Sequence, residues 1–275
     1  MEVHLNQQVL ECPVVVKPAG YALQRDNENY YFVPFLCWVI ETETLGTKGS
    51  LEEFLSECPP FPSIGITFCK HIVDGLSVVH GAGFTHGSLN MSAVIMRTII
   101  SGPSTIPKII PQLHNFKSSV NKNTKDPMYR KQGNEFDAPE LRNENGDCRR
   151  PFNDMLNCDI FSLGMVIVHS IASRKLKDLG TFESNPSFVS SAIKEVKAVM
   201  AEAKYGSAVI KKLVQALEEM LEPDPTKRIS SLEGIRFAIE AVLNNRCQGL
   251  DEESSNQHKS RFRNSISRGM KRLGL

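Results

Sequence analysis

Hydrophobic and polar positions divide the chain into a short β-rich beginning and a longer helical body. Residues 14–42 are rich in β-branched and aromatic side chains, and the polar stretch 25–28 interrupts them. This pattern is typical of two strands joined by a turn. From residue 50 onward apolar positions recur at helical spacing instead, as at Phe68, Ile72 and Leu76. The chain therefore reads as an α+β protein that is mainly helical.

The helical part is punctuated by recognisable start signals. Ser50 and Ser230 are each followed three residues later by a glutamate, which is the spacing of a capping box. Two short strands are expected at 93–100 and 105–110, around a turn at 101–104. The polar stretch 115–136 is expected to be an exposed, irregular loop. Helices are predicted at 50–57, 63–82, 154–173, 188–203, 207–222 and 230–245.

Composition narrows the functional classes. The net charge of +1 gives no reason to expect nucleic acid as a partner. The start of the chain lacks the basic and apolar runs of a signal peptide, and no stretch of 18 uninterrupted apolar residues suggests a membrane span. The seven cysteines are an odd number without Cys/His metal-ligand spacing. We expect a cytoplasmic protein, with a nuclear location also open, that has neither disulfides nor structural zinc.

Several short motifs occur in a fixed order along the chain. They are CPVVVKPAGY at 12–21, GSLEEFL at 49–55, IVDGLSVVH at 72–80, THGSLNMSAVI at 85–95, APE at 138–140, DIFSLG at 159–164 and DPTKR at 224–228. Together they resemble the protein kinase superfamily. The matched family segments are the link from helix C to the fourth strand, the stretch after the hinge, the helix leading into the catalytic loop HRDLxxxN, the APE motif, the DxWSxG helix and the DPxxR before the last helix.

The resemblance implies a protein kinase-like fold, made mainly of the helical C-lobe with an N-lobe reduced to about two strands. The corresponding units are a partial N-lobe at 1–48 (the end of helix C, two strands and the hinge), a C-lobe at 49–246 and a basic, disordered tail at 247–275. In this alignment the chain begins inside helix C, so the Gly-rich loop and the strand with the phosphate-binding lysine have no place. The six Lys/Arg of the tail also leave a docking or membrane-surface segment open.

Three residues match structural anchors of the family. The resemblance implies a buried ion pair between Glu140 of the APE motif and Arg228 before the last helix. It also implies that Asp159 accepts backbone N–H groups of the catalytic loop and so holds His86 in place. These roles maintain the fold and perform no chemistry.

The residues that carry phosphoryl transfer in the family are replaced here. Ser88 stands at the position of the catalytic aspartate, and Ala93 stands at that of the metal-binding asparagine. Gly87 replaces the arginine of the HRD motif. Losing a positioned general base removes about 10²–10⁴ in rate. With Ser88 and Ala93 in these places, the resemblance predicts that catalysis is lost.

The position of the DFG aspartate has two possible placements. LHNFK at 113–117 puts Asn115 there, whereas counting from Lys108 puts Pro111 there. Neither is an acid, and no Asp or Glu occurs in the 51 residues between Asp74 and Asp126. Magnesium prefers hard oxygen ligands, usually one or two carboxylates. The sequence therefore predicts no metal site and no cofactor.

These observations favour a catalytically inactive pseudokinase that serves as a protein-interaction scaffold or allosteric partner. Its expected partners are other proteins, among them an active kinase or a longer version of the same chain. The main alternative is a divergent ATP-dependent serine/threonine protein kinase, using ATP and magnesium, whose N-lobe is missing from this chain. Nucleotide binding without transfer, and a Ser–His hydrolase built on His86 and Ser88, are further alternatives; a packing role for His86 is preferred to the latter because no GxSxG elbow is present.

Overall fold

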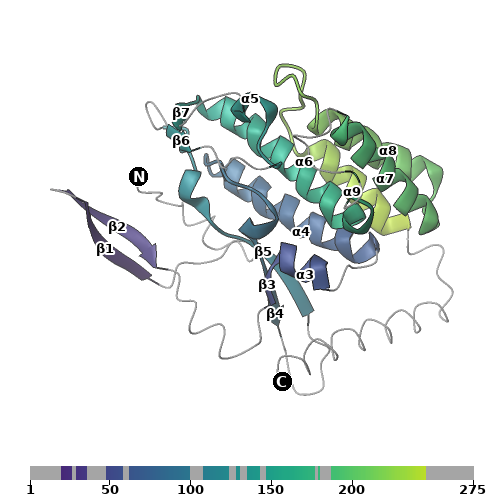
Figure 1. Ribbon diagram of the computed structural model, residues 1–275, viewed down its shortest axis with the longest axis horizontal. Helices are drawn as coiled ribbons and strands as arrows, with labels where there is room; N and C mark the ends of the chain where they lie inside the picture. Colours follow the sequence, from purple (N-terminus) through teal and green to yellow (C-terminus); the bar gives the residue numbers. More distant parts are fainter. Residues whose placement is uncertain are drawn as a thin grey trace.

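In the residues that it describes, the computed structural model of the chain is mainly helical and has three small antiparallel sheets (Figure 1). The predicted end of helix C, the hinge and the basic tail lie outside the residues that the structure describes, so the proposed division into 1–48, 49–246 and 247–275 stays a prediction. The described residues are 20–26, 29–35, 48–57, 62–99, 108–123, 128–130, 135–142, 147–176, 179 and 187–245.

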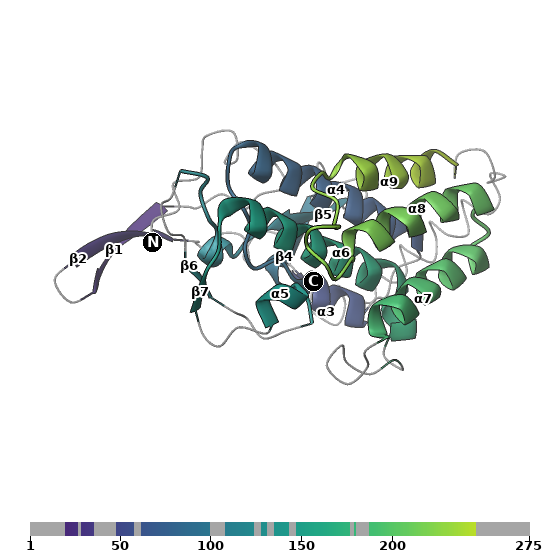
Figure 2. The same ribbon diagram turned by 90° about the horizontal axis from the view of Figure 1, so that it is seen from above.

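The predicted pair of strands near the start of the chain is confirmed, with narrower bounds. β1 (Gly20–Asp26) and β2 (Asn29–Phe35) run antiparallel, from the pair Gly20–Phe35 to the pair Asp26–Asn29. They form a two-stranded sheet of their own. Figures 1 and 2 show this hairpin at one end of the molecule, away from the helices.

A three-stranded sheet lies beside the helices. Its order is β3 (Lys48–Ser50), β4 (Val94–Ile99) and β5 (Lys108–Leu113), with antiparallel neighbours. β5 extends three residues beyond the predicted end at residue 110. It does so through Pro111, which a strand tolerates at the edge of a sheet because no further strand needs its missing N–H.

A third small sheet was not predicted. β6 (Met128–Arg130) pairs antiparallel with β7 (Asp147–Arg149). Each strand has three residues and lies in a polar stretch, so neither shows the alternation of apolar positions that reveals a strand.

The first two helices follow the sequence closely. α3 (Leu51–Glu57) begins with the predicted capping box: Ser50 Oγ accepts the N–H of Glu53 at 3.3 Å, and Glu53 Oε2 accepts that of Ser50 at 3.2 Å. α4 (Pro62–Gly81) matches the helix predicted at 63–82. Its buried side packs against α6, α9 and β5.

Figure 2 shows α6 (Phe152–Leu176) in the middle of the helical part, where α7 and α8 pack against it and α9 packs on α4 and α8. Four further helices complete this part of the described residues. They are α5 (Pro139–Arg142), α7 (Phe188–Glu202), α8 (Ser207–Met220) and α9 (Glu233–Asn245). In the described part of the chain, only α6 is long and apolar enough to cross a membrane, and 83% of its most apolar window is buried in the protein. Its apolar composition is therefore explained by its central position against α4, α7 and α8.

The predicted capping box of the last helix is wrong. α9 begins at Glu233 and not at Ser230, and Ser231 Oγ accepts the Glu233 N–H at 3.2 Å. The chain just before α9 is bonded to α8, because the Ile229 N–H donates to Glu219 O at 3.3 Å. This contact with α8 delays the start of the helix.

Candidate functional site

One carboxylate from α6 fixes the loop that follows α4. The two oxygens of Asp159 accept the backbone N–H groups of His86 at 2.6 Å and Gly87 at 2.8 Å. His80 Nε2 lies 2.9 Å from Asp159 Oδ2. Asp159 is 2% exposed, so this charge is satisfied by partners inside the protein and not by water. The structure thus brings together Asp159 and His86, as the resemblance implied.

His86 occupies a packing position. It is fully buried, and its ring lies 4.6 Å from that of Phe116, centre to centre. Its Nδ1 accepts the Ser88 backbone N–H at 3.3 Å. Burial lowers the pKa of His86 to about 4, although the Asp159 charge acts in the opposite direction, so the ring is neutral at neutral pH.

Ser88 is tied to the segment that follows β5. Its hydroxyl donates to the backbone oxygen of Asn115 at 2.6 Å, and the residue is 5% exposed. The Nδ1 of His86 is engaged by the Ser88 backbone and not by its hydroxyl. The arrangement therefore does not form the nucleophile–base pair that a Ser–His hydrolase would need.

Ala93 offers a buried methyl group where the family has a metal ligand. Its N–H donates to Asn90 Oδ1 at 2.8 Å, and its carbonyl accepts the N–H of His114 at 3.0 Å. Asn90 thereby caps the 3₁₀ turn Met91–Ala93. The polar groups of this turn are used to hold its own shape and to join it to the end of β5.

The structure separates the two placements of the DFG position. Pro111 lies buried inside β5, paired with Met96. Asn115 lies after the strand in a left-handed conformation (φ 67°, ψ 50°), which asparagine adopts more readily than most residues, and its carbonyl meets Ser88. Asn115 is thus the residue that faces the loop.

The expectation that 115–136 is an exposed, irregular loop is wrong for its first part. Ser118, Ser119 and Val120 are buried. Thr85 is the partner of Ser119 and Val120: its N–H donates to Val120 O at 2.9 Å, and its hydroxyl accepts the Val120 N–H at 2.9 Å. The Ser119 hydroxyl donates to Thr85 O. These bonds satisfy polar groups that would otherwise favour an exposed position.

Gly87 lies where this segment comes closest to the loop. Its φ is 73°, which glycine adopts without strain. A Cβ at this position would overlap the backbone carbonyl of Ser118. Gly87, at the position of the family arginine, is therefore required by the local backbone. The sequence alone did not predict this requirement.

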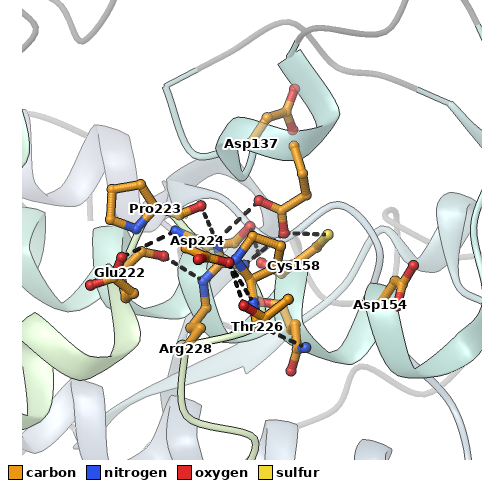
Figure 3. A network of polar contacts seen from close by, with 12 residues as sticks. Asp137, Asp154, Cys158, Glu222, Pro223, Asp224, Thr226 and Arg228 are labelled. Atoms are coloured by element: carbon orange, nitrogen blue, oxygen red, sulfur yellow. Dashed lines mark hydrogen bonds and ion pairs between the residues drawn. The ribbon is translucent and has the colours of Figure 1, made fainter.

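Arg228 is the centre of a second polar network, which Figure 3 shows beside Cys158 and Asp224, and its charged partner is Glu140. Arg228 Nη1 donates to Glu140 Oε1 at 2.7 Å and Nη2 to Oε2 at 3.0 Å, a bidentate pair. The thiol of Cys158 donates to the same Oε1 at 3.3 Å. Burial raises the pKa of the Glu140 carboxyl, but the bonds and charge of Arg228 outweigh it and lower the pKa overall. Cys158 is a member of this network that the sequence did not reveal.

The structure offers no cluster of metal ligands in the ranges it describes. There, no three His, Cys, Asp or Glu side chains come together in a way that could hold a metal ion. Asp74, the nearest acid before the catalytic loop, pairs with Lys70 at 2.6 Å and with Arg236 at 3.8 Å on the α4–α9 side. Asp126 lies outside the described residues.

Comparison with known proteins concerns the fold alone. No protein-family model and no curated protein sequence matches the chain. A crystal structure of the Rad53 kinase domain and SCD2 in complex with AMPPNP is similar, with a TM-score of 0.50 and 14% identity over 87% of this chain and 78% of that chain. A second, of the Rad53 kinase domain and SCD2, has a TM-score of 0.47 and 12% identity, over 82% of this chain and 71% of that chain. The chain has a protein kinase-like fold: a helical C-lobe with a reduced N-lobe.

Proposed function

We propose that the protein is a pseudokinase, a kinase-like domain that does not transfer phosphate and acts by binding other proteins. The observation that carries this proposal is the replacement of both loop positions that phosphoryl transfer needs. Ser88 and Ala93 stand at these positions, and each is engaged within the protein. Catalysis of phosphoryl transfer consists almost entirely of positioning and charge stabilisation, so their loss leaves little to replace it.

The hydrogen bonding of Ser88 also supports the proposal that the protein does not transfer phosphate. Its hydroxyl donates its proton to a backbone carbonyl, so no base among the described residues accepts that proton. Asn115 could supply a neutral oxygen to a cation but no charge. A kinase that turns over at about 1–100 per second would fall by at least about 10² from the loss of the base alone.

A binding role is supported by the structural contacts of the fold that are retained although the catalytic residues are replaced. The Glu140–Arg228 pair holds α5, and the Asp159 bonds hold the loop that follows α4. Both segments contribute to the surface of a kinase-like C-lobe. We propose that the surface around β6, β7 and α5, together with α7 and α8, contacts partner proteins in the cytoplasm. An active kinase, or a longer version of this chain, is the expected kind of partner.

The alternative is a divergent serine/threonine kinase in which further residues complete an ATP site and Asn115 holds the metal. Its supporting observation is the placement of Asn115 beside the loop. Transfer of ³²P from labelled ATP to the chain itself and to a general protein substrate discriminates the two, with Ser88→Ala as the matched control. We expect no signal above a blank in either protein. A signal in the wild type that disappears in Ser88→Ala would establish the enzyme instead.

A further inference from the structure

The hairpin of β1 and β2 is a sheet without further strands among the residues that the structure describes. Figures 1 and 2 show it at one end of the molecule, away from the helices. A two-stranded hairpin alone is at best marginally stable in water, and a third strand or a packed face is needed for independent stability. The N–H and C=O groups along an outer edge can bind such a strand. The register decides which edge is suited to it.

The register identifies the backbone groups that face outward. Asp26 is paired with Asn29, and only two residues separate them, so the next pair along would join two adjacent residues. Asp26 and Asn29 are therefore a hydrogen-bonded pair, and bonded and non-bonded pairs alternate from there along the hairpin. In β1, the even-numbered residues use their N–H and C=O groups inside the hairpin. Those of Tyr21, Leu23 and Arg25 face outward.

The outer edge of β2 is interrupted by a proline. By the same alternation, the outward positions of β2 are Tyr30, Phe32 and Pro34. Pro34 has no N–H, so it leaves the bonds of the hairpin intact and removes one donor from the outer edge. Proline on an edge strand is one of the ways in which sheets resist pairing with further chains. The outer edge of β1 contains no proline, so it keeps its full set of donors and acceptors.

We infer that the chain dimerises through β1, which pairs antiparallel with β1 of a second copy. A two-fold axis at Leu23 places this residue opposite its own copy, and it places Tyr21 opposite Arg25 of the second copy. Each of these opposing pairs exchanges two backbone hydrogen bonds, so the outward groups from Tyr21 to Arg25 are all used. The product is a four-stranded sheet with a β1 strand from each copy at its centre and a β2 strand at each edge. This inference does not depend on whether the chain transfers phosphate.

Charge and edge protection both favour this register. Asp26 lies opposite Gly20 of the second copy, and Arg25 lies opposite an uncharged tyrosine, so no like charges oppose each other. Moving the axis from Leu23 to Arg25 would place the two arginines opposite one another. Both outer edges of the four-stranded sheet carry Pro34, which opposes the addition of further strands. The assembly therefore closes as a two-fold dimer and does not grow into a filament.

Amide hydrogen exchange, measured by NMR on the full ¹⁵N-labelled chain at a series of concentrations, tests the pairing residue by residue. Sedimentation velocity on the same samples gives the dimer Kd. At ten times Kd about a fifth of the chains remain monomeric, so exchange at Tyr21, Leu23 and Arg25 should be about fivefold slower than in a dilute sample. Exchange at Tyr30 and Phe32 should not depend on concentration. Slowing at Tyr30 and Phe32 instead, protection of the β1 edge at every concentration, or a chain that is monomeric up to about 1 mM would overturn the inference.

Two proline variants separate the two edges. Leu23→Pro removes an outward N–H at the centre of the proposed contact, and the hairpin itself does not use this group. Phe32→Pro is the matched control, because Phe32 is the cross-strand partner of Leu23 and its N–H faces outward on the opposite edge. We expect Leu23→Pro to raise the dimer Kd at least about tenfold, because two hydrogen bonds are lost at the axis. Phe32→Pro should leave the Kd within about threefold. An equal rise in both variants, or no rise in Leu23→Pro, would contradict the inference.

Discussion

Replacing Arg228 with methionine is expected to lower the free energy of unfolding by about 3–5 kcal/mol, measured by urea denaturation. The guanidinium is buried and makes two bonds to Glu140. It also donates to the carbonyls of Asn157 at 3.0 Å and Glu222 at 2.9 Å. Removing it leaves the Glu140 carboxylate, which is only 11% exposed, and these carbonyls without their donor. This is the costly way to break an ion pair that is largely withdrawn from water.

Two variants separate this pair from a general surface effect. Lys227→Met removes the neighbouring, exposed ion pair with Asp224 and should change stability by less than about 0.5 kcal/mol. The double variant Glu140→Met/Arg228→Met should be more stable than the sum of the single losses predicts, because neither charge is then left alone. A loss below about 1 kcal/mol in Arg228→Met would contradict the anchoring role.

The same pair has a predictable pH dependence within this experiment. The folded pKa of Glu140 is lowered from 4.5 by Arg228, so its contribution to stability is complete above pH 4.5 and is lost as the pH falls through the folded pKa. In Arg228→Met that contribution is absent. The difference in stability between wild type and variant should therefore narrow as the pH falls below about 4.5.

Gly87→Ala should destabilise the protein by about 2–4 kcal/mol, again by urea denaturation. The left-handed backbone conformation and the overlap with the Ser118 carbonyl both oppose any side chain there. Gly234→Ala is the matched control: the added methyl meets nothing within 4 Å on α9, so it should stabilise by up to about 1 kcal/mol. Stability of Gly87→Ala within 0.5 kcal/mol of wild type would refute the close approach of the two segments.

The close contact between Gly87 and Ser118 also affects how the segment after β5 could be regulated. The family arginine cannot simply be restored at this position, because its Cβ would meet the same carbonyl. The segment 118–120 is instead held by neutral hydrogen bonds to Thr85, which bonds the Ser119 hydroxyl and the Val120 N–H. We therefore expect its position to be independent of phosphorylation.

What the sequence could predict depended on how local the signal was. The capping box of Ser50 and Glu53 lies within four residues, and it is present as predicted. The same pattern at Ser230 misled, because a contact between Ile229 and α8 overrides it. Propensity and spacing do not contain such tertiary contacts.

In the candidate site, too, the sequence predicted some contacts and missed others. The resemblance pointed to Asp159 and to Arg228, since motif order carries long-range pairings that composition does not. The fastening of Thr85 to Ser119 spans 34 residues and has no motif, so the polar stretch after β5 read as an exposed loop. A polar residue is buried when it finds a partner, and only the structure shows the partner.

The most direct test of the central claim is the melting temperature of the full chain with ATP, with and without magnesium. A ligand that binds only the folded state raises the melting temperature by an amount that grows with the logarithm of its concentration relative to Kd. We expect no magnesium-dependent rise, either in the wild type or in Asn115→Ala. A clear rise with magnesium in the wild type that is lost in Asn115→Ala would show that the loop grips a metal–nucleotide, and would contradict the pseudokinase account.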